Sequence, residues 1–395
     1  MNSTHWIYGA EGNANLVLRY VGPDPSLKTK VLRLQKAATL AEEETPDFIL
    51  EFINTVIAPL LGQNYVVPMS VVPIDPKFLK AIAIAIEPSR PKKRLQHPID
   101  YSVPWAFLAT DLTRQWHPSP TMTIELKPKW GFLPTSPLIK TAHRSIKRRQ
   151  CRFCMHSQLR NPEVLHYCPM DLYSLDPARM RHALRELLLH HNQQKLRLFL
   201  DGRNVALDGV ADHSDSLRAF FLQEQPNMLI NSLVDLVLEI LIRDPILQKL
   251  KSLQSRLDEL DVEGILAFYQ AHPDLPTHDI SVWQNVVKRF QKRIETQPHL
   301  EQLIPEDANE KIQRLYEYVL SMTFKDCSIM ISVTPHTGAL TSENTIKLNN
   351  QVYVYNVKVV DIDLKKMSKI PYWFNLDQRI VEHALQHQIQ RTCVE

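Results

Sequence analysis

The sequence has few glycines, few cysteines, little excess charge and no long apolar run. Its 9 glycines stand against 27 prolines in 395 residues, and nothing in this composition is typical of a fibrous or disordered chain. Its 5 cysteines, an odd number without a disulfide-like framework, are typical of a reducing compartment. No segment reaches membrane-spanning length, and the N-terminus lacks the pattern of a signal peptide. We therefore expect a soluble intracellular protein, nuclear or cytoplasmic, without membrane contact.

The remaining composition is that of an ordinary folded protein. Hydrophobic residues make up 44% of the chain and charged residues 23%. The length fits two or three domains or one large bilobal body. Since the net charge is only +3, attraction for a polyanion has to come from local clusters of basic residues.

The first 35 residues have a pattern of strands separated by glycines. Gly9, Gly12 and Gly22 stand at the predicted breaks between three strands. Glycine tolerates backbone conformations that let amides approach phosphates, so the loop GAEGNAN over residues 9–15 is a candidate phosphate loop. A plain hairpin has the same pattern, and the sequence alone leaves both interpretations open.

The third predicted strand carries a single cation among aliphatic neighbours. Strand periodicity places Arg33 on one face of residues 30–36, with Leu32 and Leu34 on the other. A guanidinium offers a fork of donors that suits nucleotide phosphates. The next segment, residues 45–61, starts with a Thr-Pro-Asp cap and then shows helical periodicity, so we expect a helix packed on this sheet.

A charged segment, IELKPKWGFLP, occupies residues 124–134. If it is a strand, Glu125, Lys127 and Lys129 share one face, and two fixed cations suit a substrate with several phosphates. Pro128 removes a ladder donor, which predicts the end or the edge of a sheet. The alternative is an edge strand whose lysines are merely solvated.

A basic run without any acid follows over residues 140–160. It contains Cys151, Cys154 and His156, and with His166 and Cys168 these residues offer ligands for zinc, although the spacing departs from paired knuckles. One functional class open at this point is therefore a zinc-assisted RNA- or polyanion-binding module over residues 140–170.

The second half of the chain is mostly helical and then becomes strand-like. Residues 179–189 and much of 214–320 show amphipathic helical patterns whose apolar stripes predict core. Strands are expected at 195–200, 325–333 and 351–365, and a closing helix at 376–390. Asp361, Asp363 and Lys365 end the last strand, where paired carboxylates suit magnesium or simply a turn.

Read in order, these features are the parts of a phosphotransferase. Backbone and a strand cation would hold a nucleotide, carboxylates would hold magnesium, and a further Asp would accept a hydroxyl proton. The protein-kinase motif H-R-D is absent, so we do not expect a protein acceptor.

Seven segments then occur in a family-like order over most of the chain: GAEGNANLVLRY, KVLRLQK, IELKPKWGFLP, RFCMHSQLR, YCPMDLYS, KDCSIMIS and DIDLKKMSKIPYW. Together they resemble the inositol-pentakisphosphate 2-kinase family. The resemblance implies an α+β, two-lobed fold distantly like protein kinases, with a β-rich N-lobe over 1–110 and a helix-rich C-lobe over 111–395. It also implies transfer of the ATP γ-phosphate, with magnesium, to the 2-hydroxyl of inositol 1,3,4,5,6-pentakisphosphate, giving phytate. A kinase of a less phosphorylated inositol is the alternative within enzymes. We expect a monomer that binds no nucleic acid.

The same resemblance assigns roles by motif. Asp326 would be the general base, and Lys127 would contact the transferred group as well as substrate. Asp361 and Asp363 would bind the metal. The nucleotide would be held by Gly12, Asn13, Asn15, Arg33 and Asp111. The substrate phosphates would be held by Arg90, Lys127, Lys129, Arg152, His156, Arg160, Lys365 and Lys369.

The chain departs from the family pattern in a few places. Arg160 stands where lysine is common, and Lys369 where arginine is frequent. Gln193, Gln194 and Lys195 replace a pattern with paired asparagines, so their contacts are left open. Some relatives carry a Cys and His zinc site in the large lobe, but the matching region has histidines such as His272 and His278 and no cysteine. Zinc is therefore not carried over from the family.

Overall fold

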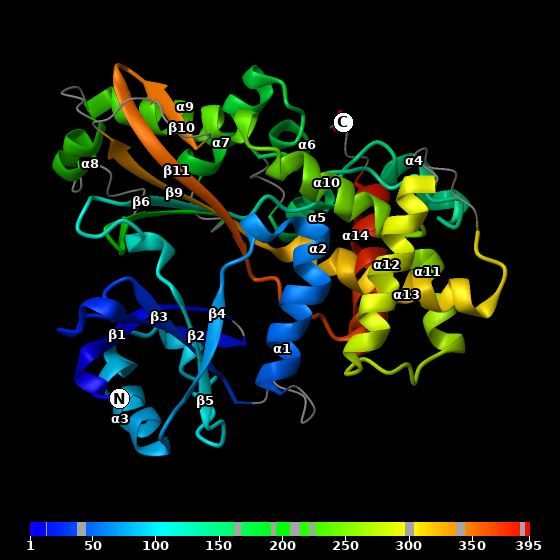
Figure 1. Cartoon of the computed structure of the whole chain (residues 1–395). Helices are drawn as coiled ribbons and strands as arrows, with labels where there is room; N and C mark the ends of the chain where they lie inside the picture. The colour runs from blue at the N-terminus through cyan, green and yellow to red at the C-terminus, as the bar shows by residue number, and fades with distance from the viewer. Residues whose placement is uncertain are drawn as a thin grey trace.

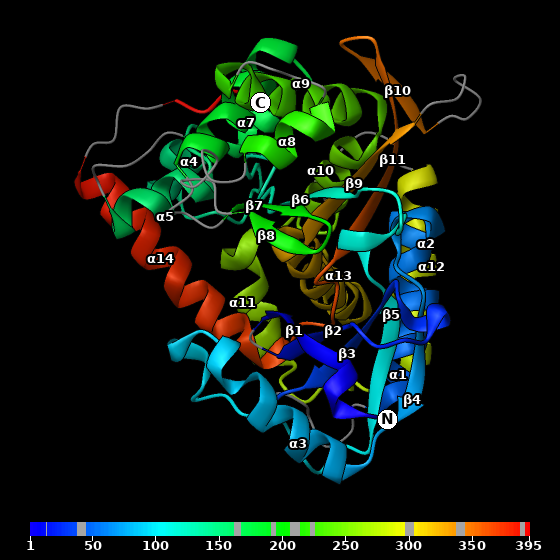
Figure 2. The same cartoon turned by 90° about the vertical axis from the view of Figure 1, so that its left-hand side faces the viewer.

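The computed structural model describes residues 1–12, 14–37, 45–161, 167–190, 195–205, 214–221, 226–296, 304–336, 344–387 and 392–395. Asn13, His166, Gln193 and Gln194 lie outside these ranges, as does the predicted helix end beyond residue 387. The fold is α+β, as predicted, with two antiparallel sheets and many helices. Both views place the five-stranded sheet below the six-stranded sheet (Figure 1, Figure 2).

The five-stranded sheet is built from the first part of the chain. Its order is β1 (Trp6–Glu11), β2 (Asn15–Tyr20), β3 (Lys30–Gln35), β5 (Trp105–Thr110) and β4 (Met69–Pro73). Leu32 and Leu34 are buried, which confirms the predicted inward face of β3. A helix that the sequence analysis did not predict, α3 (Pro76–Ile86), packs against this apolar face. Gly9 was expected at a break, but it lies inside β1, where the register with β2 shifts.

The helix predicted at 45–61 is present, but it packs elsewhere than expected. Thr45 caps α1 (Pro46–Phe52), which continues through a π-helical turn (Ile53–Ile57) into α2 (Ala58–Leu61). The Phe52 ring lies 5.7 Å from the Trp283 ring of α12 (Ile280–Thr296). The apolar residues of α1 and α2 therefore join the helical core rather than the core of the preceding sheet. Both helices lie beside α12 (Figure 1, Figure 2).

The six-stranded sheet is assembled from segments far apart in the sequence. Its order is β10 (Thr345–Leu348), β11 (Gln351–Val360), β9 (Ser328–His336), β6 (Met122–Leu126), β7 (Leu196–Leu200) and β8 (Arg203–Val205). Because β6 lies between β9 and β7, Pro128 follows the end of an inner strand and is not on an edge strand.

Two predicted strands are shorter than expected. β6 ends at Leu126, and Lys129 has φ 65°, so the two lysines of the IELKPKWGFLP segment lie on irregular backbone instead of one strand face. Likewise β11 ends at Val360, and Asp361 has φ 61°, so Asp361, Asp363 and Lys365 follow the strand. Strand β4 begins at Met69, after a short helical turn at Gln63–Tyr65.

Helices fill the rest of the described chain. The predicted amphipathic stripes form core, and Leu233, Leu250, Trp283 and Leu315 share one large apolar cluster. The closing helix begins at Ile370, before the predicted start, with Pro371 in its first turn. None of the helices in the described ranges is both long enough and apolar enough to cross a membrane. The remaining helices are α4 (Thr141–Lys147), α5 (Arg152–Arg160), α6 (Pro169–Leu172), α7 (Pro177–Leu189), α8 (Ser214–Phe221), α9 (Pro226–Arg243), α10 (Ile246–Arg256), α11 (Asp261–Ala271), α13 (Ala308–Asp326) and α14 (Ile370–Gln386).

Candidate active site

The strand register brings three distant charged segments to one edge of the six-stranded sheet. β9 is antiparallel to both neighbours, with Ile329 opposite Leu126 of β6 and Ser328 opposite Val360 of β11. The end of β6, the start of β9 and the end of β11 therefore meet. As a result, Lys127 Nζ lies 3.1 Å from a carboxylate oxygen of Asp361.

Asp326 lies between two lysines at this edge. It is the last residue of α13, and its carboxylate is 3.2 Å from Lys129 Nζ and 3.3 Å from Lys365 Nζ. Its side chain is 58% exposed, whereas that of Lys129 is only 18% exposed. Partial desolvation disfavours the carboxylate, but Lys129 and Lys365 outweigh it and hold the pKa of Asp326 below its ordinary value. The group is ionised at neutral pH and open to a ligand.

The five-stranded sheet contributes a second group of residues to the same place. Arg33, from β3, forms an ion pair with Asp363, and Asn15 Nδ2 lies 3.5 Å from the same carboxylate. The structure thus joins two residues expected to contact a nucleotide with a residue expected to bind a metal. The carboxylates of Asp361 and Asp363 remain partly exposed, at 53% and 36%, and oxygen ligands of this kind suit magnesium.

The glycine loop begins as a hairpin and has open space beside it. The Gly12 N–H donates to the Asn15 carbonyl at 2.9 Å, and a Cβ at Gly12 would meet no atom of the described residues within 4 Å, its chain neighbours apart. Lys36 is buried, pairs with Glu11 and donates to the Gly12 carbonyl at 2.9 Å. This buried charge pair fixes the end of β1 next to the open space, so a hairpin and a phosphate loop are compatible here.

Helix α5 presents a basic face toward the same region. Arg152, His156 and Arg160 recur every four residues and therefore share one side of the helix. Desolvation, followed by the positive charges of Arg152 and Arg160, lowers the pKa of His156 to about 4. The positive charges of Lys195 and Lys129 lower the pKa of His156 further, so this face of α5 lies close to both lysines.

Lys195 is a further cation of this site whose contacts the sequence left open. Lys195 directly precedes β7, and its carbonyl accepts a hydrogen bond of 2.8 Å from the Lys127 N–H. Desolvation and then repulsion by Lys129, Arg160 and Lys127 lower the pKa of Lys195 to about 8. Its neighbours Gln193 and Gln194 lie outside the described residues.

Gln254 was missed by the sequence analysis, although it ties the lysine segment to the general-base candidate. It is fully buried in α10 and donates to the carbonyls of Lys129 and Phe324, both at 2.9 Å. It also accepts from the Gly131 N–H at 2.8 Å. The signal was available, because a glutamine interrupts the otherwise apolar stripe of that helix.

Two tyrosines of the YCPMDLYS segment hold the irregular backbone after β6. The Tyr167 hydroxyl donates to the Pro128 carbonyl at 3.0 Å, and the Tyr173 hydroxyl to the Lys129 carbonyl at 3.2 Å. A Cβ at Gly131 would lie 2.7 Å from the Tyr173 ring, so the turn needs glycine for this close approach. These contacts hold in place the backbone that carries Lys129.

A buried ion pair lies next to Asp326 in the sequence and anchors the end of α13 in the protein interior. Lys325 is fully buried and pairs with Asp258 in the interior. Its ammonium lies 4.2 Å from the centroid of the Trp130 ring, and the guanidinium of Arg152 lies 4.7 Å from the same ring. One indole therefore connects the end of α13 with the start of α5.

Three predicted residues have other partners in the structure or none within this group. Arg90 binds Glu11 through two hydrogen bonds of 3.0 and 2.8 Å. Asp111 is buried, lies 3.2 Å from Arg19 and accepts from the Thr113 N–H. Lys369 is exposed at the end of a short turn (Met367–Lys369) before α14. Their roles stay predictions.

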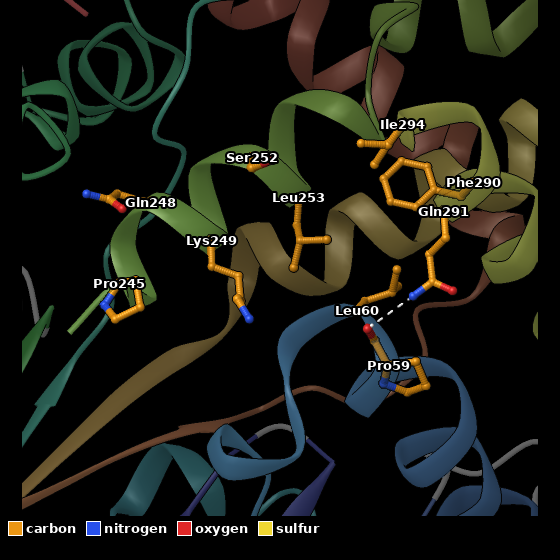
Figure 3. A pocket seen from close by; sticks show the side chains of 10 residues that line it. All are labelled: Pro59, Leu60, Pro245, Gln248, Lys249, Ser252, Leu253, Phe290, Gln291 and Ile294. Atoms are coloured by element: carbon orange, nitrogen blue, oxygen red, sulfur yellow. Dashed lines mark hydrogen bonds between the residues drawn. The ribbon is translucent and has the colours of Figure 1, made fainter. Parts of the chain in front are cut away.

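A surface pocket elsewhere shares none of these residues. It lies between α2, α10 and α12, with Leu60, Leu253 and Phe290 among its lining, and Gln291 Nε2 donates to the Pro59 carbonyl at 3.2 Å (Figure 3). Its cation, Lys249, lies 5.5 Å from the Tyr65 ring. The pocket offers no arrangement of acids and cations comparable to that at the sheet edge.

Exposed carboxylates beside half-buried lysines and arginines are typical of a phosphotransferase that binds small molecules with several phosphates. The chain belongs to the inositol-pentakisphosphate 2-kinase family, whose model matches residues 8–379. The resemblance seen in the sequence is thereby confirmed.

Curated relatives come from plants and animals. An inositol-pentakisphosphate 2-kinase of Arabidopsis thaliana is 29% identical, over 96% of this chain and 93% of the relative. One from Oryza sativa subsp. indica is 28% identical, over 95% and 92%, and one from Danio rerio is 26% identical, over 98% and 94%.

Proposed function

We propose that this chain transfers the γ-phosphoryl group of ATP to the 2-hydroxyl of inositol 1,3,4,5,6-pentakisphosphate and so makes the hexakisphosphate. The observation that carries the proposal is the position of Asp326 between Lys129 and Lys365, on the sheet edge that also holds Lys127 and Asp361. An ionised carboxylate held among cations can accept a hydroxyl proton while phosphates occupy the cations.

The proposed body has two lobes, distantly like protein kinases, with residues 1–110 as N-lobe and 111–395 as C-lobe. The five-stranded sheet with α3 has an apolar core of its own, which supports this division. Helices α1 and α2 are the exception, because their apolar residues join the core of the larger part. They would serve as a bridge between the lobes.

ATP would lie between the glycine loop and the end of β11. Arg33, Asn15 and Gly12 would contact its phosphates, with Asn13 and Asp111 as further contacts. Magnesium would be held by Asp361 and Asp363 and would neutralise charge on the transferred phosphoryl group. Arg33 and Lys127 would then exchange their carboxylate partners for phosphate oxygens.

The inositol phosphate would lie against Lys129, Lys365 and the basic face of α5. Phosphates binding these lysines would compete with Asp326 for the same cations, which would raise the pKa of Asp326 toward that of a better base. Lys195 belongs to this wall, since it shares the field of Lys127, Lys129 and Arg160. Lys369 would add a contact from the C-terminal side, and Arg90 would have to leave Glu11 to join.

The decisive experiment offers ATP, magnesium and one inositol phosphate at a time, and identifies the product isomer by NMR. We expect the pentakisphosphate with a free 2-hydroxyl to be converted to the hexakisphosphate, with less phosphorylated inositols turned over more slowly. A faster reaction with a less phosphorylated inositol would replace the proposed substrate. Absence of any ATP-dependent product would favour a polyanion-binding module instead, a function that the family membership does not favour.

Binding of inositol pentakisphosphate is expected to protonate His156. Its pKa is about 4 because of desolvation and the surrounding positive charges, so the ring is neutral at pH 7. Phosphates neutralise those charges and raise the pKa, so the complex takes up a proton and affinity increases as the pH falls from 8 to 6, by at most ~10-fold per pH unit. NMR of labelled histidine rings, with and without the ligand, measures the shift.

The matched comparison is His156→Gln. It keeps a polar side chain but cannot titrate, and it shares with the parent protein all protonation of the ligand itself and of Lys195. The difference between the two pH profiles therefore belongs to His156. Parallel profiles, or an unchanged ring signal on binding, would remove His156 from the phosphate contacts.

A further inference from the structure

The start of α5 and the C-terminal segment of the chain meet in a cluster of four cysteines. Cys151 caps α5, Cys154 lies in its first turn, Cys168 precedes α6, and Cys393 comes from the C-terminal segment. Their sulfur atoms all lie within 4.8 Å of one another, and all four side chains are buried. This set differs from the ligands suggested by sequence spacing, because His156 lies two residues beyond Cys154 and so faces the other side of the helix.

The distances suit one tetrahedral ion rather than a disulfide. Cys151 Sγ and Cys168 Sγ are 3.9 Å apart, about twice the length of an S–S bond of ~2.0 Å. Four sulfurs at ~2.3 Å from a zinc ion would be about 3.8 Å from one another. We propose that Cys151, Cys154, Cys168 and Cys393 form a structural zinc site, in which the thiolates leave no coordination position open.

The surroundings of the cluster support a bound cation with four thiolate ligands. Met170, Leu133 and Phe153 enclose it and keep water away. The Cys154 N–H donates to Cys151 Sγ at 3.4 Å, a hydrogen bond that stabilises a thiolate. Zinc with four thiolates carries two negative charges, and the basic run over residues 140–160 provides a favourable field for them.

Such a site would fix the helix that carries Arg152, His156 and Arg160. The C-terminal segment already docks on the body, because the Cys393 N–H donates to the Arg149 carbonyl at 2.9 Å and the Leu133 N–H to Glu395 at 2.5 Å. A metal bond to Cys393 would lock this segment over the start of α5. The site is independent of phosphoryl transfer, so its test does not depend on the proposed substrate.

The experiment begins with metal analysis of the full chain purified without chelators. We expect one zinc per chain and, by X-ray absorption at the zinc edge, four sulfur neighbours at about 2.3 Å. Less than stoichiometric zinc after incubation with zinc chloride, stoichiometric iron, or a Cys151–Cys168 disulfide found by mass spectrometry would overturn the proposal. None of these measurements requires a variant to fold.

A pair of serine variants then tests the ligand assignment. Cys393→Ser is expected to weaken zinc binding at least ~100-fold, measured in competition with a chelating dye. Replacing residues that only hydrogen-bond to metal ligands already lowers metal affinity about 10- to 100-fold. Hydrogen exchange in α5 of Cys393→Ser should also become faster. Cys327→Ser is the control, since Cys327 is the remaining cysteine, is also buried and, among the described residues, donates to the Phe324 carbonyl and to no other group. Equal zinc affinity in the two variants would exclude Cys393 as a ligand.

Discussion

Replacing Asp326 by asparagine is expected to lower kcat by about 10²- to 10⁴-fold, the usual contribution of a positioned general base. Asparagine keeps the shape and can still lie between Lys129 and Lys365, but it cannot accept a proton from the substrate hydroxyl. Release of ADP with inositol pentakisphosphate as acceptor, in single-turnover and steady-state assays, measures the loss.

Substrate binding should survive the same change. Removing one negative charge from a site that binds polyphosphates relieves repulsion, so calorimetry should find unchanged or tighter binding. Asp307→Asn is a matched control, because Asp307 caps the opposite end of α13 and asparagine is an equally good cap. Turnover of Asp326→Asn within a few-fold of the parent protein would take the base role away from Asp326.

The sequence predicted most residues of this site but not how they meet. Period two suggested that Lys127 and Lys129 share one face of a strand, whereas they lie on irregular backbone and contact different carboxylates. The pairing of β6 with β9 joins residues about 200 positions apart, and no local pattern encodes which strand ends become neighbours. Family motifs supplied that information instead.

Supporting residues were the least visible in the sequence. Gln254 stands out in an apolar helix stripe and Lys325 was expected in a strand, but the carbonyls, the amide and the indole that they contact become evident only in the fold. Cys393 is an extreme case, since its partners lie more than 200 residues away. The packing of α1 and α2 was mispredicted for a related reason, because an apolar stripe shows that a helix is buried but not against what.

Replacing Lys147 by methionine is expected to destabilise the protein by about 3–5 kcal/mol, the usual effect of leaving a buried charge uncompensated. The Lys147 ammonium is 2.7 Å from Asp261, 2.9 Å from Asp377 and 3.3 Å from Glu263. These contacts join α4, α11 and α14. Burial opposes the charge on Lys147, yet the acids outweigh it and raise the pKa of Lys147. Urea denaturation of both proteins measures the difference.

The loss should be smaller in acid, which distinguishes a charge effect from a packing effect. Without the opposing charge of Lys147, the folded-state pKa of Asp261 is expected to rise still further above its unfolded value of ~4. Burial already raises the pKa of Asp261 to about 7 with Lys147 present. The folded variant then binds more protons than the unfolded chain, so its stability rises as the pH falls from 8 to 5, and the gap to the parent protein narrows.

Lys140→Met is the control for this comparison, because Lys140 belongs to the same basic run but is exposed, with Nζ 2.6 Å from Gln378. An exposed position of this kind should change stability by no more than about 0.5 kcal/mol at either pH. Loss of Lys147 should also affect the candidate active site, because Arg152 lies 3.5 Å from Asp377, one of the acids that Lys147 neutralises. A pH-independent loss in Lys147→Met would mean that packing of the lysine stem, and not its charge, holds these three helices together.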